Sequence, residues 1–327
     1  MKCVVCGTAG NFKNLFSLRD RVFAVDGSFD FLRCPSCAAV IINPQLSGDA
    51  LMAHYPSTYH EDYTQRYESL SAKKGVMNKV RAFLKFGTLA QFFGYGRRHC
   101  FLFFLWPLIY EFAQYPRFVR GGKLFEVGSG TGAFLKLMDE LGWDVYGCDI
   151  SPSACAVAAS MGLRNISCGP FDPTAHPQGF FDAVVLYHVL EHLPDPHVAV
   201  RGFWDLLKPG GELVMSLPNT GGLTARIFGK NWIGYEAPRH LVSYNPENLG
   251  LVLQKNGFVV DRVITNSALG GIVDSIELIL GKKRSSLVLL HKAARAMKFF
   301  LDPFADFFKI GDQLVIRARK PVGREIP

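Results

Sequence analysis

The sequence feature that most constrains the fold is the stretch KLFEVGSGTG at residues 123–132. A short apolar run ends at Glu126, and three glycines then alternate with Ser129 and Thr131 before an apolar segment typical of a helix. Glycines let the backbone turn sharply from a strand into a helix and leave room for a ligand against it. The NAD fingerprint is G-x-G-x-x-G, whereas the spacing here is G-x-G-x-G. The stretch therefore indicates a ligand-binding strand–loop–helix unit that differs from the NAD type.

The residues after this loop alternate between short apolar runs and segments typical of helices. Strands are expected over residues 143–149, 165–168, 181–187 and 212–217, and helices after Ser151-Pro152 and over residues 198–207. The run FDAVVLY at 181–187 is continuously apolar, as expected of a parallel strand that is buried on both faces. The stretch 311–320 predicts a last strand. This alternation predicts a doubly wound α/β sheet.

Several motifs resemble those of the class I S-adenosylmethionine (SAM)-dependent methyltransferases. An acid two residues before the first glycine resembles motif I, and FDAVVLYHVLEHLPDP (181–196) resembles motif IV with its following loop. LLKPGGELVMSLPN (206–219) is similar to the helix, turn and fifth strand of that family. The segment 232–260 is similar to the branch with ubiquinone-biosynthesis-type O-methyltransferases and glycan-cluster methyltransferases. The resemblance implies a seven-stranded, Rossmann-like methyltransferase sheet.

The same resemblance assigns a SAM site. It implies that Glu126 and the glycine loop hold the methionine end, Asp149 the ribose hydroxyls and Ile150 the adenine face. At the end of the third strand the family usually carries an acid for the adenine. Here either Asp172 takes that role two residues late, or Phe171 stacks on the adenine. The predicted cofactor-binding residues are Glu126, Gly128, Ser129, Gly130, Gly132, Asp149, Ile150, Phe171, Asp172, Tyr187 and His188.

Residues 188–192 read HVLEH, which matches the H-x-x-E-H signature of inverted zinc metalloproteases. Such a site needs both histidines one turn apart on a sustained helix. A strand is expected to end at residue 187, two prolines at 194 and 196 limit any helix to about one turn, and no third ligand is indicated. We therefore interpret HVLEH as a ligand-binding loop at the carboxyl end of a strand.

A general base is needed only if the methyl acceptor must lose a proton. The candidates are the imidazoles of His188, His192 and His240, which titrate near neutral pH, and the carboxylate of Glu191 in the same loop. The alternative is that each of these side chains only anchors its own loop. Trp232 and Tyr235 are expected either to stack on an acceptor ring or sugar, or to pack in the core.

Four of the eight cysteines form two pairs, Cys3-x-x-Cys6 and Cys34-x-x-Cys37. The 27 residues between the pairs contain alternating apolar segments suited to a small β-ribbon, although this loop is longer than the usual zinc-ribbon spacing. We predict a closed, structural Zn²⁺ site of four thiolates; free or disulfide-bonded cysteines are the alternative. The pattern, followed by NPQLS and YPSTYHEDY, resembles zinc-ribbon-fronted members of the same branch, which include sugar C-methyltransferases. The other cysteines are predicted to be small core residues: Cys100, Cys148, Cys155 and Cys168.

The net charge of +8 comes from two flanks. Residues 64–123 hold 11 Lys and Arg against 2 Asp and Glu, and residues 282–327 hold 11 against 4, whereas residues 124–281 hold 9 against 16. Both flanks are also rich in Phe and Leu. Two interpretations stay open: peripheral contact with an anionic membrane, or a helical cap that packs on the sheet or forms a homodimer. No recognised binding motif accompanies the charge, so no nucleic-acid partner is predicted.

The chain shows no run of about 18 uncharged apolar residues and no signal peptide, so we expect a cytoplasmic protein, with the inner membrane face as its one candidate peripheral location. The predicted domains are a zinc ribbon over 1–45, a basic, aromatic helical linker or cap over 46–118, and a methyltransferase domain over 119–327 with a hydrophobic helical insertion near 270–310. The predicted function is SAM-dependent methyl transfer to an oxygen or carbon of a small molecule, a saccharide or lipid-linked intermediate of surface-glycan or secondary-metabolite synthesis. The alternative is a non-catalytic SAM- or nucleotide-binding protein of a biosynthetic complex.

Overall fold

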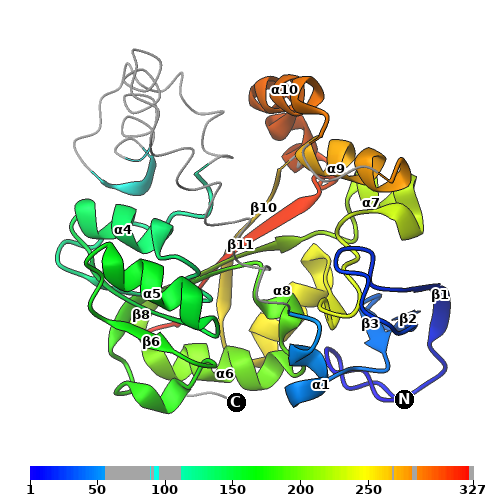
Figure 1. The fold of residues 1–327 in the computed structure, drawn as a ribbon. Coiled ribbons are helices and arrows are strands. Elements are labelled where there is room, and N and C mark those ends of the chain that lie inside the picture. Colours follow the sequence, from blue (N-terminus) through cyan, green and yellow to red (C-terminus); the bar gives the residue numbers. More distant parts are fainter. Residues whose placement is uncertain (56–88, 90–91, 96–111, 267–268, 282–285, 324–327) are drawn as a thin grey trace.

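The computed structural model describes residues 1–55, 89, 92–95, 112–266, 269–281 and 286–323. Most of the basic, aromatic segment predicted over residues 46–118 lies outside the described residues, and so does Cys100. The described elements form two β-sheets and the helices that cover them (Figure 1).

The larger sheet has seven strands in the order β10-β11-β8-β7-β4-β5-β6. Their bounds are Lys123–Val127 for β4, Asp144–Asp149 for β5, Ile166–Cys168 for β6, Phe181–Tyr187 for β7, Leu207–Pro218 for β8, Val259–Asn266 for β10 and Gln313–Arg319 for β11. The strands from β6 to β8 are parallel, and β11 runs antiparallel between β8 and β10. The predicted doubly wound, seven-stranded sheet is confirmed.

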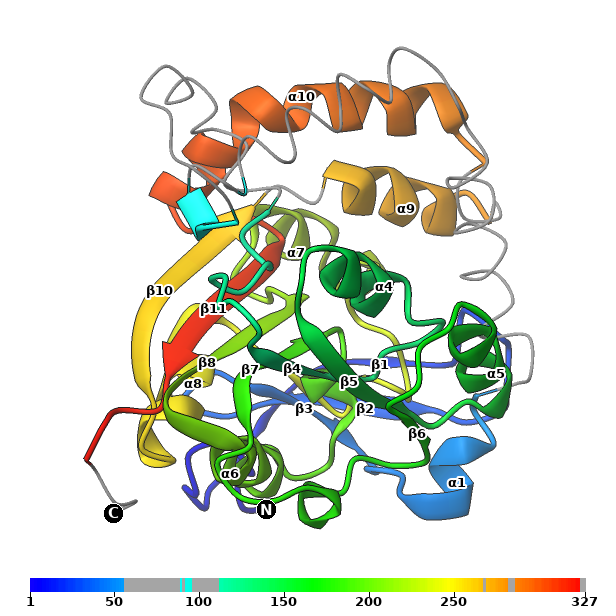
Figure 2. The same cartoon turned by 90° about the vertical axis from the view of Figure 1, so that its left-hand side faces the viewer.

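Helices cover both faces of this sheet, as the turned view in Figure 2 shows. Their bounds are Ala133–Glu140 for α4, Pro152–Ser160 for α5, Pro196–Leu206 for α6 and Pro246–Lys255 for α8. Adjacent residues of β4 point to opposite faces, because side chains alternate along a strand. Leu124 packs in a core with Leu135 of α4, whereas Phe125 packs in a second core with Phe203 of α6 and Leu249 of α8. The sheet is therefore the middle layer of three.

The smaller sheet is antiparallel and is formed mainly by the N-terminal residues. Its order is β1 (Lys13–Leu18), β2 (Phe29–Arg33), β3 (Val40–Asn43) and β9 (Val242–Ser243). Strand β9 comes from the segment after β8, which also carries α7 (Leu223–Phe228) and the 3-10 turn η5 (Gly229–Asn231). A strand from a distant part of the chain thus completes the N-terminal sheet.

Hydrogen bonds also dock the N-terminal sheet against α6 and α8. Lys255 donates to the carbonyl of Cys6 at 2.7 Å, Asn248 donates to that of Cys37 at 3.3 Å, and the His197 Nε2 lies 2.8 Å from that of Val5. A short helix, α1 (Gly48–Met52), follows β3. The cysteine-bearing turns are therefore fixed to the helices that cover one face of the large sheet.

Two helices lie between β10 and β11, where a hydrophobic insertion was predicted. They are α9 (Leu269–Ile279) and α10 (Val288–Phe307), and they pack against each other at the outer edge of the molecule (Figures 1 and 2). None of the helices in the described ranges combines the length and the apolar content needed to cross a bilayer.

The cysteines outside the two pairs differ in burial. Cys148 is buried in β5, as predicted, and Cys155 is partly buried. Cys168 is exposed, so the prediction of a core residue was wrong there. It ends β6, which is an edge strand with a neighbour on one side only, so fewer groups cover it.

Candidate functional site

The glycine loop joins β4 to α4, and its three glycines have backbone conformations that favour glycine. The φ angles are +70° at Gly128, +54° at Gly130 and +78° at Gly132. A Cβ at Gly128 would lie 2.5 Å from a methyl carbon of Val189, and a Cβ at Gly132 would lie 2.4 Å from Leu163. A Cβ at Gly130 would meet nothing within 4 Å. The middle glycine therefore borders open space, whereas the outer two are required by close packing.

Two buried side chains at this loop carry polar atoms without a hydrogen-bond partner. Glu126 is 4% exposed and its Oε2 has none; Ser129 is 7% exposed and its Oγ has none. Burial, and then the nearby charge of Asp149, raise the pKa of Glu126 well above its usual range. Buried polar atoms in folded proteins nearly always find a partner. Their lack of one here fits a ligand with polar groups at the glycine loop.

Asp149 ends β5 beside the loop and is 6% exposed. Its carboxylate accepts hydrogen bonds from the backbone N–H of Gly130 at 2.7 Å and of Ser151 at 2.9 Å. Four acceptor lone pairs on a carboxylate leave capacity for further donors. The next residue, Ile150, is 42% exposed, an apolar side chain on the surface next to this acid.

The two adenine candidates after β6 have other contacts in this structure. Asp172 accepts from the Thr174 N–H at 2.8 Å and hydroxyl at 2.7 Å, which caps the 3-10 turn η3 (Pro173–Ala175). These bonds lower the pKa of Asp172. The Phe171 ring packs 5.0 Å from that of Phe203. Their adenine roles stay predictions.

The residues after β7 form a tight group around a buried carboxylate. Tyr187 donates through its hydroxyl to the carbonyl of Gln114 at 2.6 Å. His188 has a φ of +55°, and its N–H donates to the Ser216 carbonyl at 2.8 Å. The His188 Nδ1 lies 3.3 Å from a carboxylate oxygen of Glu191, and their side chains are 51% and 1% exposed. A buried carboxylate therefore lies beside a half-exposed imidazole.

Glu191 is ionised at neutral pH despite its burial. Burial opposes the charged form, but the contact with His188 and the positive charges that His188, His192 and His240 carry when protonated outweigh it and lower the Glu191 pKa to about 2. The His192 pKa is also lowered, to about 4, by burial and then by the charge of His240. At neutral pH a buried carboxylate thus faces a neutral His192 imidazole.

His192 and His240 meet although 47 residues separate them, with ring centroids 4.8 Å apart. The His192 Nδ1 lies 2.9 Å from the Tyr55 hydroxyl and 3.0 Å from the Arg239 carbonyl, and the His240 Nδ1 lies 2.8 Å from the Gly234 carbonyl. Both rings are therefore held by other groups. The sequence interpretation missed Tyr55, whose only signal is its place in the tyrosine-rich stretch after the cysteine pairs.

Arg239 anchors this group to the N-terminal sheet, and the sequence interpretation missed it too. Its guanidinium donates to both carboxylate oxygens of Asp20 at 2.8 and 3.0 Å, and its Nε donates to Glu236 at 2.6 Å. The Arg239 and Asp20 side chains are 0% exposed. The neighbouring Leu241 N–H donates to the Glu191 carbonyl at 2.7 Å. A fully buried ion pair thus fixes the segment that carries His240.

The metalloprotease interpretation of HVLEH has no support in the local structure. β7 ends at Tyr187, and Leu190–His192 is a single 3-10 turn, η4, so the two histidines do not share a helix. The sequence around HVLEH indicates no third ligand, but in the folded chain His240 lies beside Glu191 and His192. Glu191, His192 and His240 each offer one ligand atom within 4.8 Å of the others, which is close enough to hold a cation.

The four paired cysteines come together at one point, and none forms a disulfide. The Sγ atoms lie 3.7 Å apart for Cys3 and Cys37 and 3.6 Å apart for Cys6 and Cys34, and all four lie within 4.8 Å of one another. Four Zn–S bonds of about 2.3 Å in a tetrahedron place the sulfurs about 3.8 Å apart. The cluster therefore fits a closed Zn²⁺ site.

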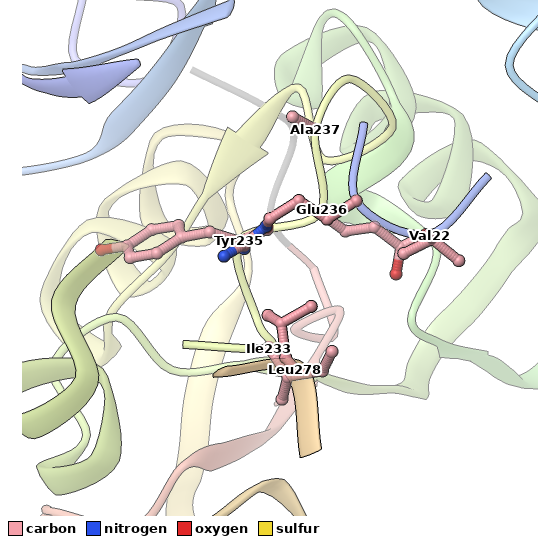
Figure 3. A pocket seen from close by; sticks show the side chains of 7 residues that line it. Val22, Ile233, Tyr235, Glu236, Ala237 and Leu278 are labelled. Carbon is pink, nitrogen blue, oxygen red and sulfur yellow. The ribbon is translucent and has the colours of Figure 1, made fainter. Parts of the chain in front are cut away.

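A pocket lies where the loop between β1 and β2, the segment after β8 and α9 meet (Figure 3). Its lining residues are Arg21, Val22, Ile233, Tyr235, Glu236, Ala237 and Leu278. Trp232 and Tyr235 are 2% and 5% exposed, and their rings pack 5.1 Å apart, so core packing is correct for both. Neither the glycine loop nor His188 lines this pocket, so we do not assign a methyl acceptor to it.

Comparisons with known proteins agree on one family. A family profile described as "Methyltransferase domain" matches residues 100–263, about half of the chain. The chain is 33% identical over 129 residues to a ubiquinone biosynthesis O-methyltransferase of Xanthomonas oryzae pv. oryzae (37% of this chain, 54% of that protein). It is 29% identical over 169 residues to one of Xanthomonas axonopodis pv. citri (48% of this chain, 71% of that protein). The chain thus spans about half the length of the first of these curated relatives.

Solved structures also match this chain, at lower identity. A SAM-dependent methyltransferase from Archaeoglobus fulgidus matches with a TM-score of 0.44 and 22% identity, over 65% of this chain and 91% of that chain. A SAM-dependent methyltransferase from Thermotoga maritima matches with a TM-score of 0.45 and 19% identity, over 75% and 96%.

Proposed function

Because this chain belongs to the class I SAM-dependent methyltransferase family, we propose that it transfers a methyl group from SAM to an oxygen or carbon of a small molecule. The observation that carries the proposal is the glycine loop. Its buried Glu126 has a carboxylate oxygen without a partner, its Gly130 borders open space, and Asp149 ends the neighbouring strand. A carboxylate at that position accepts hydrogen bonds from ribose hydroxyls.

The residues present fit SAM. Glu126 and the loop around Ser129 would hold the methionine end, Asp149 the ribose and Ile150 the adenine face. Glu126 favours its neutral form because of its burial, and a cationic ammonium beside it would favour the carboxylate. SAM supplies an electrophilic methyl group on a sulfonium, and much of the barrier to in-line displacement is lowered by positioning alone.

Among the base candidates, the contacts favour His188. Its Nδ1 faces the Glu191 carboxylate at 3.3 Å, which leaves Nε2 to take a proton from an acceptor hydroxyl. The buried Glu191 carboxylate would hold the ring and stabilise the imidazolium that forms, as a carboxylate does for histidine in hydrolase triads. His192 is a weaker base because its pKa is lowered to about 4, and its Nδ1 lies against Tyr55 and Arg239.

Two acceptor classes deserve direct testing. The relatives are named as O-methyltransferases of ubiquinone biosynthesis, which supports a hydroxylated ubiquinone precursor. The zinc-ribbon pattern at the N-terminus resembles sugar C-methyltransferases, which supports a saccharide or lipid-linked sugar. Cys3, Cys6, Cys34 and Cys37 would hold Zn²⁺ as a structural ion, since four thiolates leave no open coordination position.

The proposal is tested in two steps. Calorimetry with SAM and S-adenosylhomocysteine measures cofactor binding, and labelled SAM then measures transfer to each acceptor class. For an oxygen acceptor we expect His188→Ala to lower kcat by about 10²–10⁴-fold, because general-base catalysis contributes that much. Glu191→Gln should give a smaller loss and a shifted pH profile. Cofactor binding without turnover on any acceptor would instead favour a non-catalytic SAM-binding protein.

A further inference from the structure

Helix α10 presents large apolar side chains to solvent. Its outer stripe, as we name it, consists of Leu289, Met297, Phe304 and Phe307, which are 81, 53, 59 and 78% exposed. At about 100° per residue these positions fall within an arc of about 80° around the helix. Figure 2 shows α10 along the outside of α9, so the stripe lies at the edge of the molecule.

The opposite side of α10 is polar and faces the protein. Asp302 and Asp306 are 3% and 8% exposed, and the Asp306 carboxylate accepts from the Thr265 N–H of β10 at 2.9 Å. The His291 Nε2 lies 3.3 Å from a carboxylate oxygen of Glu277 on α9. A surface helix normally buries its apolar face and exposes its charges. In α10 that arrangement is reversed, which indicates an apolar partner for the outer stripe.

The charges around the stripe point to the nature of this partner. Residues 282–309 contain seven Lys and Arg and two Asp and Glu, and the two acids are the buried Asp302 and Asp306. Lys292 is exposed, about 100° from the middle of the stripe, and Lys298 is partly exposed, about 140° from it on the other side, so both reach the headgroups along their flexible side chains. An apolar stripe flanked by lysines matches the boundary between acyl chains and anionic headgroups.

We propose that α10 lies flat on an anionic lipid surface, with the outer stripe at the level of the acyl chains and Lys292 and Lys298 among the headgroups. A second copy of this chain fits less well, because paired α10 helices would bring their lysines together. A stripe about 30 Å long and about 10 Å wide also offers on the order of 300 Å², below the about 800 Å² per partner of a standard interface. The proposal does not depend on methyl transfer.

The test is co-sedimentation of the full chain with vesicles of phosphatidylcholine, with and without phosphatidylglycerol. We expect binding only to the anionic vesicles, and less of it as salt rises. Leu289→Ser/Phe304→Ser/Phe307→Ser should weaken binding at least about tenfold, because buried apolar area contributes to the affinity. Lys292→Gln and Lys298→Gln should weaken it about fivefold each. The matched controls Val198→Ser and Arg201→Gln change exposed residues of α6 and should leave binding unchanged.

Sedimentation velocity and thermal unfolding of the same variants distinguish the lipid surface from two other partners of the outer stripe, a second copy of the chain and another segment of it. A wild-type dimer that the triple variant converts to a monomer, without vesicle binding, would assign the stripe to a second copy. A triple variant that melts several degrees lower and binds vesicles as before would assign it to another segment of this chain. Either result overturns the proposal, as does failure of the wild-type protein to bind anionic vesicles at low salt. Intact cofactor binding in the triple variant would show that a loss of vesicle binding is not a loss of fold.

Discussion

The buried ion pair between Asp20 and Arg239 makes a quantitative prediction for the variant Asp20→Asn. Both side chains are 0% exposed, and the guanidinium contacts both carboxylate oxygens. Burial opposes the charged form of Asp20, but the hydrogen bond from Arg239, the Phe23 N–H and the Arg239 charge outweigh it and lower the Asp20 pKa. This pair joins the N-terminal sheet to the segment that carries His240.

The expected loss follows from what remains around Arg239. Breaking a buried ion pair by removing one partner costs about 3–5 kcal/mol. Asn keeps the shape of Asp and one acceptor oxygen, and the Arg239 Nε still donates to Glu236 at 2.6 Å. We therefore expect a loss at the lower end, about 3 kcal/mol in the free energy of unfolding.

Urea unfolding at neutral pH measures this loss, and Asp26→Asn, an exposed acid in the same loop, is the control. The control should change the free energy of unfolding by less than about 0.5 kcal/mol. Because the folded-state pKa of Asp20 is lowered, its contribution is present above the unfolded pKa of about 3.9 and is lost as pH falls through the folded value. The difference in the free energy of unfolding between the wild type and Asp20→Asn should therefore become smaller below about pH 4. A loss under about 1 kcal/mol at neutral pH, or a difference in the free energy of unfolding that does not change with pH, would refute this reasoning.

Three further predictions concern the other sites. Asp149→Ala should weaken SAM binding more than about tenfold by calorimetry, because charge-assisted hydrogen bonds to the ribose are lost; unchanged affinity would remove the ribose assignment. Cys34→Ser should lose the zinc measured by metal analysis and lower the melting temperature, whereas His188→Ala should keep the zinc; zinc lost in His188→Ala and kept in Cys34→Ser would restore a zinc site in the HVLEH loop. Glu191→Gln should lower the free energy of unfolding by about 1–3 kcal/mol at pH 7. Since the Glu191 pKa falls to about 2 on folding, that difference should shrink between about pH 4 and 2, and a gap that grows in acid would contradict the contacts.

Features encoded by neighbouring residues were predictable from the sequence. The glycine loop, its preceding acid and the acid at the end of the next strand lie within 24 residues, and the structure has them at the ends of two adjacent parallel strands. The helix expected after Ser151-Pro152 is α5, and Ser151 caps it, since a cap is a contact between residues three apart. The two cysteine pairs likewise carry their chemistry in their spacing.

Tertiary structure alone decided which distant groups meet. Tyr55, His192 and His240 converge because β9 pairs with β3 and the Asp20–Arg239 ion pair closes 219 residues of chain, and no local pattern encodes such a contact. The sequence also left open which way the apolar face of α10 points, because a helical period shows that a helix has an apolar face and not whether that face is buried. The sequence by itself therefore determined the cofactor fold and the cysteine cluster, through short-range geometry. The acceptor side of the site and the outer stripe depend on long-range packing and were visible only in the folded chain.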